Sequence, residues 1–313
     1  MRWCFLAIFF CSLQSGLSGN PSSKTDQEKW EDQKEFFQKN GYIWIKHFYS
    51  PEQVLLLKNW ANAIHEDSQT LLEISKNTGC SLQSLAQKIP GALIVVPESK
   101  DPSKICRAED LLTCYPDLHQ FVFGTLTTYL RSLLNEPYAL FKDKINFKWP
   151  GGGAFPPHQD FPAFEVFGPR EHITAMVCVD AATLENGCLF VAQNWQETFA
   201  KEPEMDPVLL EKGVAILPYV IGGKNHGSIK PEYVDKITWL PIEADAGDVV
   251  FFNSYIPHYS EVNRSQSSRR AMFFTHNRLK EGEYREAYYH TKRADPDNPV
   301  FHFATPTNAR TKD

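Results

Sequence analysis

The sequence lacks the features that define several large classes of protein. None of its seven cysteines belongs to a Cys-x-x-Cys pair, which excludes a zinc-finger type of site and a disulfide-dense miniprotein. No apolar run approaches the roughly 20 residues that a membrane-spanning helix needs. The chain has no excess of positive charge, with 32 Lys and Arg against 38 Asp and Glu. We therefore expect no nucleic acid partner and no stable insertion into a membrane.

The composition that remains is that of a globular protein. The 313 residues are 42% hydrophobic and 22% charged, with a formal charge of −6. This excludes collagen-like, coiled-coil and wholly disordered chains. No internal repeat of 20 to 50 residues is visible. The length suits one large domain or two small ones, with ample apolar material for a core.

The first 19 residues have the three-part form of a secretory signal peptide. Arg2 is followed by the apolar run Trp3–Leu13 and then by the small residues Ser15–Gly19. We predict removal of residues 1–19 and a location in the lumen of the secretory pathway, outside the cell or in the periplasm. If the leader is not a signal, the location is cytoplasmic.

Removal of the leader would leave five cysteines, an odd number. They are Cys80, Cys106, Cys114, Cys178 and Cys188. In an oxidising compartment a disulfide among the first three is one option, and the sequence does not choose the pair.

The first part of the chain, about residues 25–135, reads as mainly helical. Helices are expected over residues 26–40 and from Ser50 onward, where Ser50-Pro51-Glu52-Gln53 combines a capping serine, an N1 proline and a capping-box glutamine. A further amphipathic helix is expected over 118–134, and helical pieces over 68–88. A strand is expected over residues 42–45.

From residue 138 onward the sequence pattern changes to short runs of residues typical of β-strands, separated by Gly and Pro. The expected strands are 145–149, 172–179, 188–191, 214–220, 249–252 and 270–276. Helices followed by strands predict a mainly β protein with flanking helices, a jelly roll with its core at about 138–280. We expect residues 20–313 to form a single domain, ending in a polar arm from Asp295.

Three places in the strand-rich part hold side chains suited to metal binding and to anion binding. They are His158-Gln159-Asp160, His258 and Arg269. Two imidazoles and a carboxylate form the facial triad of non-haem Fe(II), which leaves open positions for a co-substrate and O₂. Residues i and i+2 of an extended segment share a face, so His158 and Asp160 can chelate together.

The His-x-Asp signal alone is weak, because this composition gives about one such match by chance. His65-Glu66-Asp67 also matches. That copy is expected on a helix, where residues i and i+2 point about 200° apart, so the pair cannot chelate.

With these residues, the chain resembles the phytanoyl-CoA dioxygenase family of Fe(II)- and 2-oxoglutarate-dependent oxygenases. Five segments carry the resemblance together: 41–53, Asn146–Gly152, His158–Asp160, Asp180–Leu189, and Gly247–Phe251 running into His258, Ser260, Asn263 and Arg269. The resemblance implies a double-stranded β-helix, the cupin-like jelly roll. It also implies Fe(II), 2-oxoglutarate and O₂ as cofactors, with ascorbate as an auxiliary reductant.

The resemblance further implies roles for individual residues. His158, Asp160 and His258 would bind the iron. Arg269 would hold the distal carboxylate of 2-oxoglutarate, a task that suits its planar guanidinium. The remaining residues expected near the co-substrate are Ser260, Lys104 and Met176, the last of which stands where some relatives have Trp.

Substrate contacts are less constrained. Phe161, Phe164 and Glu165 could form an aromatic wall with an acidic group, or simply pack beside the metal. Lys224 and His226 lie in a Gly-rich segment that could be a substrate-contacting lid or a plain surface turn. Glu185-Asn186-Gly187 is read as a structural turn. Asn263-Arg264-Ser265 matches a glycosylation acceptor.

The resulting hypothesis is a dioxygenase that hydroxylates a small or medium organic molecule and releases succinate and CO₂. Two alternatives stay open at this stage: a jelly-roll metal enzyme that does not use 2-oxoglutarate, and a non-catalytic binding module of the same fold. The substrate, the oligomeric state and the site of oxidation do not follow from the sequence.

Overall fold

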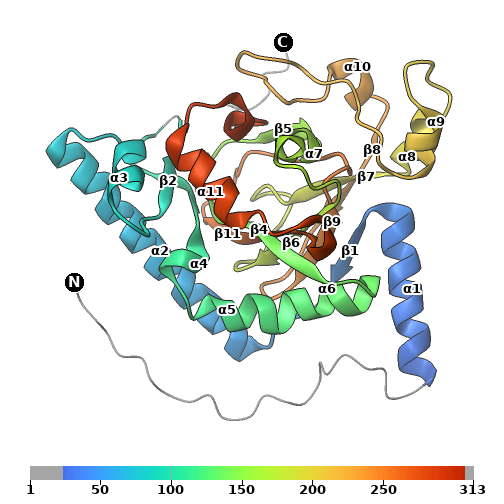
Figure 1. Cartoon of the computed structure of the whole chain (residues 1–313), viewed down its shortest axis with the longest axis horizontal. Coiled ribbons are helices and arrows are strands. Elements are labelled where there is room, and N and C mark those ends of the chain that lie inside the picture. Colours follow the sequence, from blue (N-terminus) through green and yellow to red (C-terminus); the bar gives the residue numbers. More distant parts are fainter. Residues whose placement is uncertain (1–23, 100, 307–313) are drawn as a thin grey trace.

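A computed structural model describes residues 24–99 and 101–306 of the chain (Figure 1). The N-terminal part is mainly helical, and short helices connect and follow the later strands. The helices are α1 (Lys24–Asn40), α2 (Pro51–Thr78), α3 (Leu82–Lys88), α4 (Leu111–Cys114), α5 (Leu118–Phe121), α6 (Thr127–Leu134), α7 (Phe161–Phe164), α8 (Trp195–Phe199), α9 (Pro207–Glu211), α10 (Pro231–Val234) and α11 (Arg285–Ala294).

The strands form two sheets in which all neighbours are antiparallel. The larger sheet has the order β1 (Tyr42–Ile45), β9 (Val249–Asn253), β6 (His172–Cys178), β11 (Arg269–Arg278), β4 (Tyr138–Lys148), β3 (Ile105–Glu109) and β2 (Ile94–Pro97). The smaller sheet has the order β5 (Phe155–His158), β10 (His258–Ser260), β7 (Leu189–Gln193) and β8 (Thr238–Ile242).

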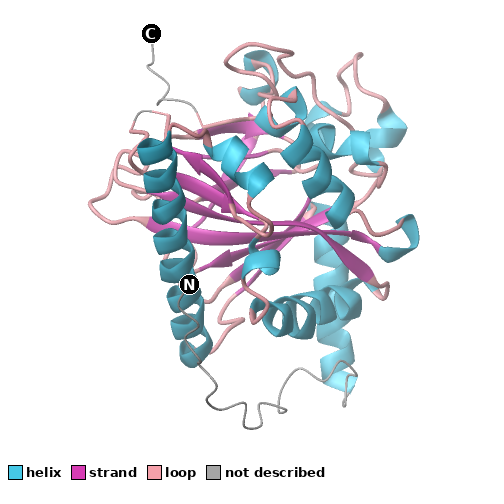
Figure 2. Ribbon diagram, turned by 60° about the vertical axis from the view of Figure 1, so that its left-hand side comes forward, coloured by secondary structure: helices cyan, strands magenta, loops and turns pink. Residues whose placement is uncertain are grey.

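Side chains of the larger sheet alternate between its two faces, and each face packs into an apolar core of its own. On β9, Val249 and Phe251 pack with the helices, whereas Val250 and Phe252 pack against the smaller sheet. Successive side chains of a strand point to opposite faces, so a continuous apolar run such as β9 is buried on both. The helices therefore cover the outer face of the larger sheet, and the two sheets enclose the inner core (Figure 2). This is the jelly roll that the strand pattern predicted.

The start of α2 follows the sequence signal closely. The Ser50 side chain accepts a hydrogen bond from the Gln53 backbone N–H, and the Gln53 side chain accepts one from the Ser50 N–H, with Pro51 at N1. The helix then continues through the polar stretch to Thr78, where Gly79 adopts φ +71°. The capping-box prediction is confirmed, and the helix extends beyond its predicted apolar part.

Several predicted elements differ from the structure. Residues 118–134 form α5 and α6 joined by a π-helical turn at Val122–Leu126. Residues 214–220 form no strand, only an isolated bridge between Tyr219 and Ile229. The sheet also takes β2 and β3 from the N-terminal part. These strands and β5, β8 and β10 are at most five residues long, and β5 and β8 contain proline, so they carry little periodic signal.

The features predicted for the ends and the cysteines have mixed outcomes. The predicted leader lies outside the described residues. All five cysteines from Cys80 onward are free thiols, so the optional disulfide is absent from the described part of the chain. Within residues 24–99 and 101–306, no helix is both long enough and apolar enough to cross a bilayer. The predicted C-terminal arm begins as a loop and forms a 3-10 turn at Pro299–His302.

Candidate active site

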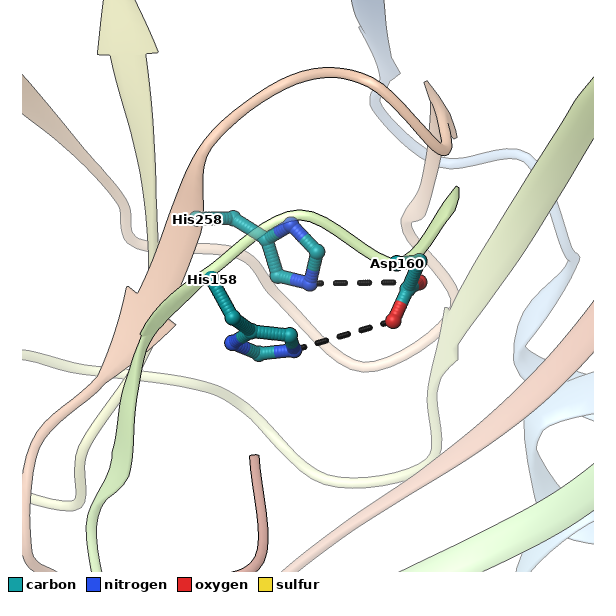
Figure 3. Close-up of side chains that lie close together, drawn as sticks. All are labelled: His158, Asp160 and His258. Carbon is teal, nitrogen blue, oxygen red and sulfur yellow. Dashed lines mark ion pairs between the residues drawn. The ribbon is translucent and has the colours of Figure 1, made fainter. Parts of the chain in front are cut away.

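The three predicted metal ligands converge where the smaller sheet pairs β5 with β10. His158 ends β5, His258 begins β10, and the two residues are partners in the antiparallel register. Asp160 follows in the turn that leads into α7. His158 Nε2 lies 3.6 Å from Asp160 Oδ1, and His258 Nε2 lies 4.0 Å from Oδ2 (Figure 3). The candidate ligand atoms all lie within 4.8 Å of one another.

Backbone carbonyls fix both imidazoles. The Nδ1 atoms of His158 and His258 lie 2.7 Å and 3.0 Å from the carbonyl oxygens of Pro156 and Ile256. A carbonyl only accepts, so each Nδ1 carries the proton and donates it, which leaves Nε2 as the lone-pair donor. Both Nε2 atoms face Asp160, as metal coordination requires (Figure 3).

Gln159, which lies between the ligands His158 and Asp160, anchors the turn that carries them. The Gln159 amide donates to the carbonyls of Ala215 at 2.8 Å and Tyr255 at 2.5 Å, and it accepts from the Leu217 N–H at 2.8 Å. Gln159 is 2% exposed. It therefore points away from the metal site and holds the backbone that presents His158 and Asp160.

The electrostatics of the triad favour metal-binding protonation states. Burial, followed by the charge of His158, lowers the pKa of His258 to about 4, so its imidazole is neutral near pH 7. Burial alone would raise the pKa of Asp160, but the adjacent His158 and His258 imidazoles hold it far below its usual range. A neutral imidazole and an ionised carboxylate are the forms that ligate a metal. Two imidazoles and one carboxylate fit non-haem Fe(II).

The second His-x-Asp match does not form such a site. His65 lies within α2, and its ring packs 5.5 Å from the ring of Phe147 and 5.2 Å from that of Trp149. In the part of the chain that the structure describes, His158, Asp160 and His258 are the only cluster with metal-binding geometry.

Two adjoining hollows that share His158 and Asp160 form one cavity at the triad, and Arg269, on β11, lines one of them. Its side chain is buried, its Nε has no hydrogen-bond partner, and no carboxylate among the described residues pairs with it. The adjacent Arg270 points the other way and forms a bidentate pair with Asp180 at 2.7 and 2.9 Å. An unpartnered buried guanidinium is the feature expected of a receptor for an anion from solution. Such a receptor fits the distal carboxylate of 2-oxoglutarate.

The other residues predicted near the co-substrate divide into two groups. Met176 and Ser260 line the cavity, as expected. Lys104 does not line it: its side chain is 45% exposed, and its ammonium pairs with Asp101 at 3.2 Å. The expectation for Lys104 was wrong because this residue precedes β3 in an exposed loop, before the chain enters the sheet.

A lysine that the sequence reading missed lies at this end of the cavity. Lys148 is 3% exposed, and its Nζ donates to Ser260 Oγ at 2.7 Å and to the carbonyl of Glu261. Burial and the charge of Arg269 lower its pKa well below the ordinary value. Lys148 stands opposite Arg269 in the β4–β11 register. It was missed because the strand was expected to begin only at residue 145, which concealed its alternation with Lys142 and Lys144.

The predicted glycosylation site lies behind the same end. Asn263 is fully buried, and its amide donates to the carbonyls of Lys148 at 2.8 Å and Ser267 at 2.7 Å. A buried amide that bonds β4 to the loop before β11 is no acceptor for a glycan, so this part of the motif is structural.

Of the residues predicted to contact the substrate, some line the cavity and others do not. Phe164 lines the cavity, whereas Phe161 lies behind it and stacks on Tyr255 with centroids 4.5 Å apart. Glu165 is an exposed partner of Arg170. These positions follow from α7, which turns Phe164 inward and the next residue outward.

The Gly-rich segment contacts the cavity only indirectly. Lys224 is exposed, and the His226 ring packs 5.3 Å from Phe303, which does line the cavity. The described residues of the C-terminal arm therefore contribute to the site, and the Gly-rich segment supports them.

Comparison with known proteins matches the site and the fold. The family profile "Phytanoyl-CoA dioxygenase (PhyH)" matches residues 37–271. A protein named 2-aminoethylphosphonate dioxygenase, from an uncultured bacterium, is 36% identical over 270 residues, covering 84% of this chain and 87% of that protein. A protein of Gimesia maris named methylphosphonate hydroxylase is 33% identical over 267 residues, covering 84% and 86%.

Solved structures agree at the level of fold. The structure of EctD from S. alaskensis with 2-oxoglutarate and 5-hydroxyectoine superposes with a TM-score of 0.58 at 17% identity, over 80% of this chain and 76% of that one. The profile covers all three candidate ligands and extends to Arg269 and its neighbours. The chain belongs to the phytanoyl-CoA dioxygenase family and is an Fe(II)- and 2-oxoglutarate-dependent dioxygenase.

Proposed function

We propose that this dioxygenase hydroxylates a small organic molecule, with Fe(II) held by His158, Asp160 and His258 and 2-oxoglutarate held by Arg269. The observation that carries the proposal is one cavity that joins the triad to an unpaired, buried guanidinium. A metal site alone would suit many enzymes. A metal site with a separate carboxylate receptor suits a co-substrate that chelates the metal at one end and carries a carboxylate at the other.

Fe(II), when bound, would supply the oxidising chemistry. With Fe(II) present, O₂ and 2-oxoglutarate give succinate and CO₂; one oxygen atom enters succinate, and the other converts a substrate C–H bond into an alcohol. The protein orients the reactants and excludes water. His158 and His258 keep their protons on Nδ1, where carbonyls hold them, so the Nε2 lone pairs stay available.

The co-substrate end is built to hold a carboxylate in one position. Arg269 offers several N–H donors, and Ser260 presents a hydroxyl whose oxygen is already occupied by Lys148 Nζ. Because Ser260 Oγ accepts from the lysine, its own proton is free to point into the cavity toward an anion. Lys148 thus positions the serine hydroxyl at this end.

The names of two relatives support small organophosphonates as the first substrates to test. Both relatives match over 84% of this chain, with 36% and 33% identical residues. We propose an organic substrate of that size with a C–H bond next to an anionic group.

The test is a reaction of the purified, iron-loaded protein with 2-oxoglutarate, ¹⁸O₂ and a panel of alkyl- and aminoalkylphosphonates. We expect succinate in step with a hydroxylated phosphonate that carries one ¹⁸O atom. His158→Ala should abolish both products and lower bound iron below one per chain. Succinate formation that is equally fast in His158→Ala, or a product without ¹⁸O, would overturn the proposal.

A second proposal concerns the compartment in which the protein works. We propose that residues 1–19 direct the chain into the secretory pathway or periplasm. Fusion of residues 1–25 to a reporter, with Leu6→Arg as a disrupted control, tests it: export of the first fusion alone is expected, and retention of both would contradict it.

A further inference from the structure

One face of β4 carries an unusual row of polar side chains. Alternate residues of a strand share a face, so Lys142, Lys144, Asn146 and Lys148 form this row. The first three line the cavity. On the neighbouring β11, the register places Thr275 opposite Lys142 and Arg269 opposite Lys148. The row therefore runs along the cavity from one end to the other.

The positive charges of the row gather at two separate ends. Lys148 lies six positions after Lys142, which is about 20 Å of extended chain. His158 and Asp160 line one side of the cavity together with Lys142 and Lys144, whereas Arg269 and Ser260 line only the other side. The triad therefore lies near the Lys142 end. A single 2-oxoglutarate has one distal carboxylate, and Arg269 accounts for it.

The Lys142 end carries more positive charge than its carboxylates balance. Arg107 and Lys292 share one partner, Glu109, at 2.9 and 2.7 Å. No carboxylate among the described residues pairs with Lys142 or Lys144. Apart from the candidate ligand Asp160, four cations and one carboxylate line this side of the cavity, a net charge of +3 when all are ionised.

Aromatic rings are the neighbours of the two unpaired ammonium groups. Lys142 Nζ lies 4.4 Å from the ring centroid of Phe164, and Lys144 Nζ lies 5.1 Å from that of Phe273. Burial, followed by the charge of Lys144, lowers the pKa of Lys142 to about 7. Ring faces compensate only part of the lost hydration of an ammonium group. Two buried ammonium groups that line a cavity without a carboxylate partner are suited to bind an anion that enters it.

Resting on the proposed function, we propose that Lys142 and Lys144, with Arg107 beside them, bind an oxyanion of the substrate, a phosphonate. The three oxygens of a phosphonate can accept from several converging donors, as Lys and Arg do for phosphate groups. Anion binding at this end would place the carbon next to phosphorus beside the metal ligands. The phosphonate end and the 2-oxoglutarate end then use different cations of the same cavity.

The experiment separates the two ends by binding, without turnover. Protein loaded with Mn(II) and 2-oxoglutarate under argon is titrated with methylphosphonate and 2-aminoethylphosphonate, with acetate and β-alanine as carboxylate counterparts. Lys142→Met and Lys144→Met remove the charge and keep the length. We expect each to raise the phosphonate Kd about 10- to 100-fold, as loss of a charge-assisted bond does. The Kd of 2-oxoglutarate should stay within about twofold.

Lys104→Met is the matched control, because Lys104 is exposed and outside the cavity. It should change neither Kd. Phosphonate affinity that survives the double variant Lys142→Met/Lys144→Met would overturn the subsite, and so would an equal loss of 2-oxoglutarate affinity. If the wild-type protein bound acetate or β-alanine more tightly than the phosphonates, the subsite would be one for a carboxylate, and its assignment to a phosphonate would be overturned.

A failure of the proposed function would look different. Slow succinate formation from 2-oxoglutarate without substrate reports the metal and Arg269 alone. Its absence from the iron-loaded wild type would contradict the proposed function. Its presence together with unchanged phosphonate binding in the lysine variants would contradict only the subsite.

Discussion

Arg269 shows how a single residue can carry a chemical prediction. It is buried with no carboxylate partner in the described part of the chain, while Arg270 next to it is fully paired with Asp180. Neighbouring residues of a strand point to opposite faces, so Arg269 faces the cavity and Arg270 faces Asp180 and Asn62 of α2 on the other side of the sheet. The contrast between the two gives a matched pair of variants.

Arg269→Ala should raise the KM for 2-oxoglutarate about 100-fold, because a bidentate charge-assisted contact contributes about 3 kcal/mol. Arg269→Lys should recover part of that loss. Arg270→Ala is the control, and it should lower the melting temperature and leave KM unchanged. Steady-state succinate assays at varied 2-oxoglutarate measure the effect. An unchanged KM in Arg269→Ala would show that the guanidinium holds something else.

His276 gives a pH prediction at the same scale. It is fully buried on β11, and burial lowers the pKa of His276 to about 4. Between about pH 6.5 and pH 4 the unfolded chain binds a proton here and the folded chain does not. Stability should therefore fall by on the order of 3 kcal/mol as the pH drops through this window, with no further loss from this residue below it.

Urea unfolding of the metal-free protein at a series of pH values tests this. His276→Asn should be less stable at pH 7.5 but should lose less between pH 6.5 and 4 than the wild type. The surface variant His119→Asn should keep the wild-type slope. A His276→Asn curve parallel to the wild type would contradict the assignment.

At the level of elements, the turn before β7 supports the co-substrate end. Gly187 has φ +77°, and a Cβ there would overlap the Glu261 carbonyl and lie 3.1 Å from Lys148 Nζ. That carbonyl accepts from Lys148, which in turn donates to Ser260. The turn predicted at Glu185-Asn186-Gly187 is thus present, and it packs directly behind the site.

Gly187→Ala should destabilise the fold by about 1–3 kcal/mol and also raise the KM for 2-oxoglutarate several-fold, since the Glu261 backbone must move. Gly222→Ala is the matched control, with φ +75° and nothing within 4 Å of the added Cβ. It should carry only the positive-φ strain of about 1 kcal/mol. Equal effects of both variants on KM would disprove the coupling.

The C-terminal arm closes the substrate end of the cavity. Phe301, Phe303 and Ala304 line it, and the Ala304 N–H donates to the His226 carbonyl at 2.9 Å. Phe303→Ala should admit water and raise the rate of succinate formation without substrate several-fold, at unchanged KM for 2-oxoglutarate. The exposed Phe123→Ala should behave as the wild type. An unchanged rate in Phe303→Ala would mean that the arm does not exclude water.

Over the whole molecule, the sequence predicted what depends on local pattern. The jelly roll followed from the strands of the second half, and the capping box at Ser50 followed from rules that need only a few neighbours. The triad and the role of Arg269 followed from the resemblance of five separated segments to a known family, because the His-x-Asp spacing alone is a weak signal.

What the sequence could not give depends on contacts between distant segments. Lys104 stands near a strand in the sequence but outside the cavity, while Lys142 and Lys144 line the cavity and Lys148 reaches Ser260 from β4, which pairs with β11. No periodic signal marks the short strands β3 and β5, so the register that brings these lysines together was not predictable.

The central claim is that the triad and Arg269 together hold Fe(II) and 2-oxoglutarate. The most direct test is an anaerobic titration of the Fe(II)-loaded protein with 2-oxoglutarate, followed by the visible charge-transfer absorption of the chelate. We predict saturation at one equivalent per chain in the wild type, a right-shifted titration in Arg269→Ala, and no band in His158→Ala. A band of wild-type intensity and affinity in His158→Ala, or none in the wild type, would contradict the account.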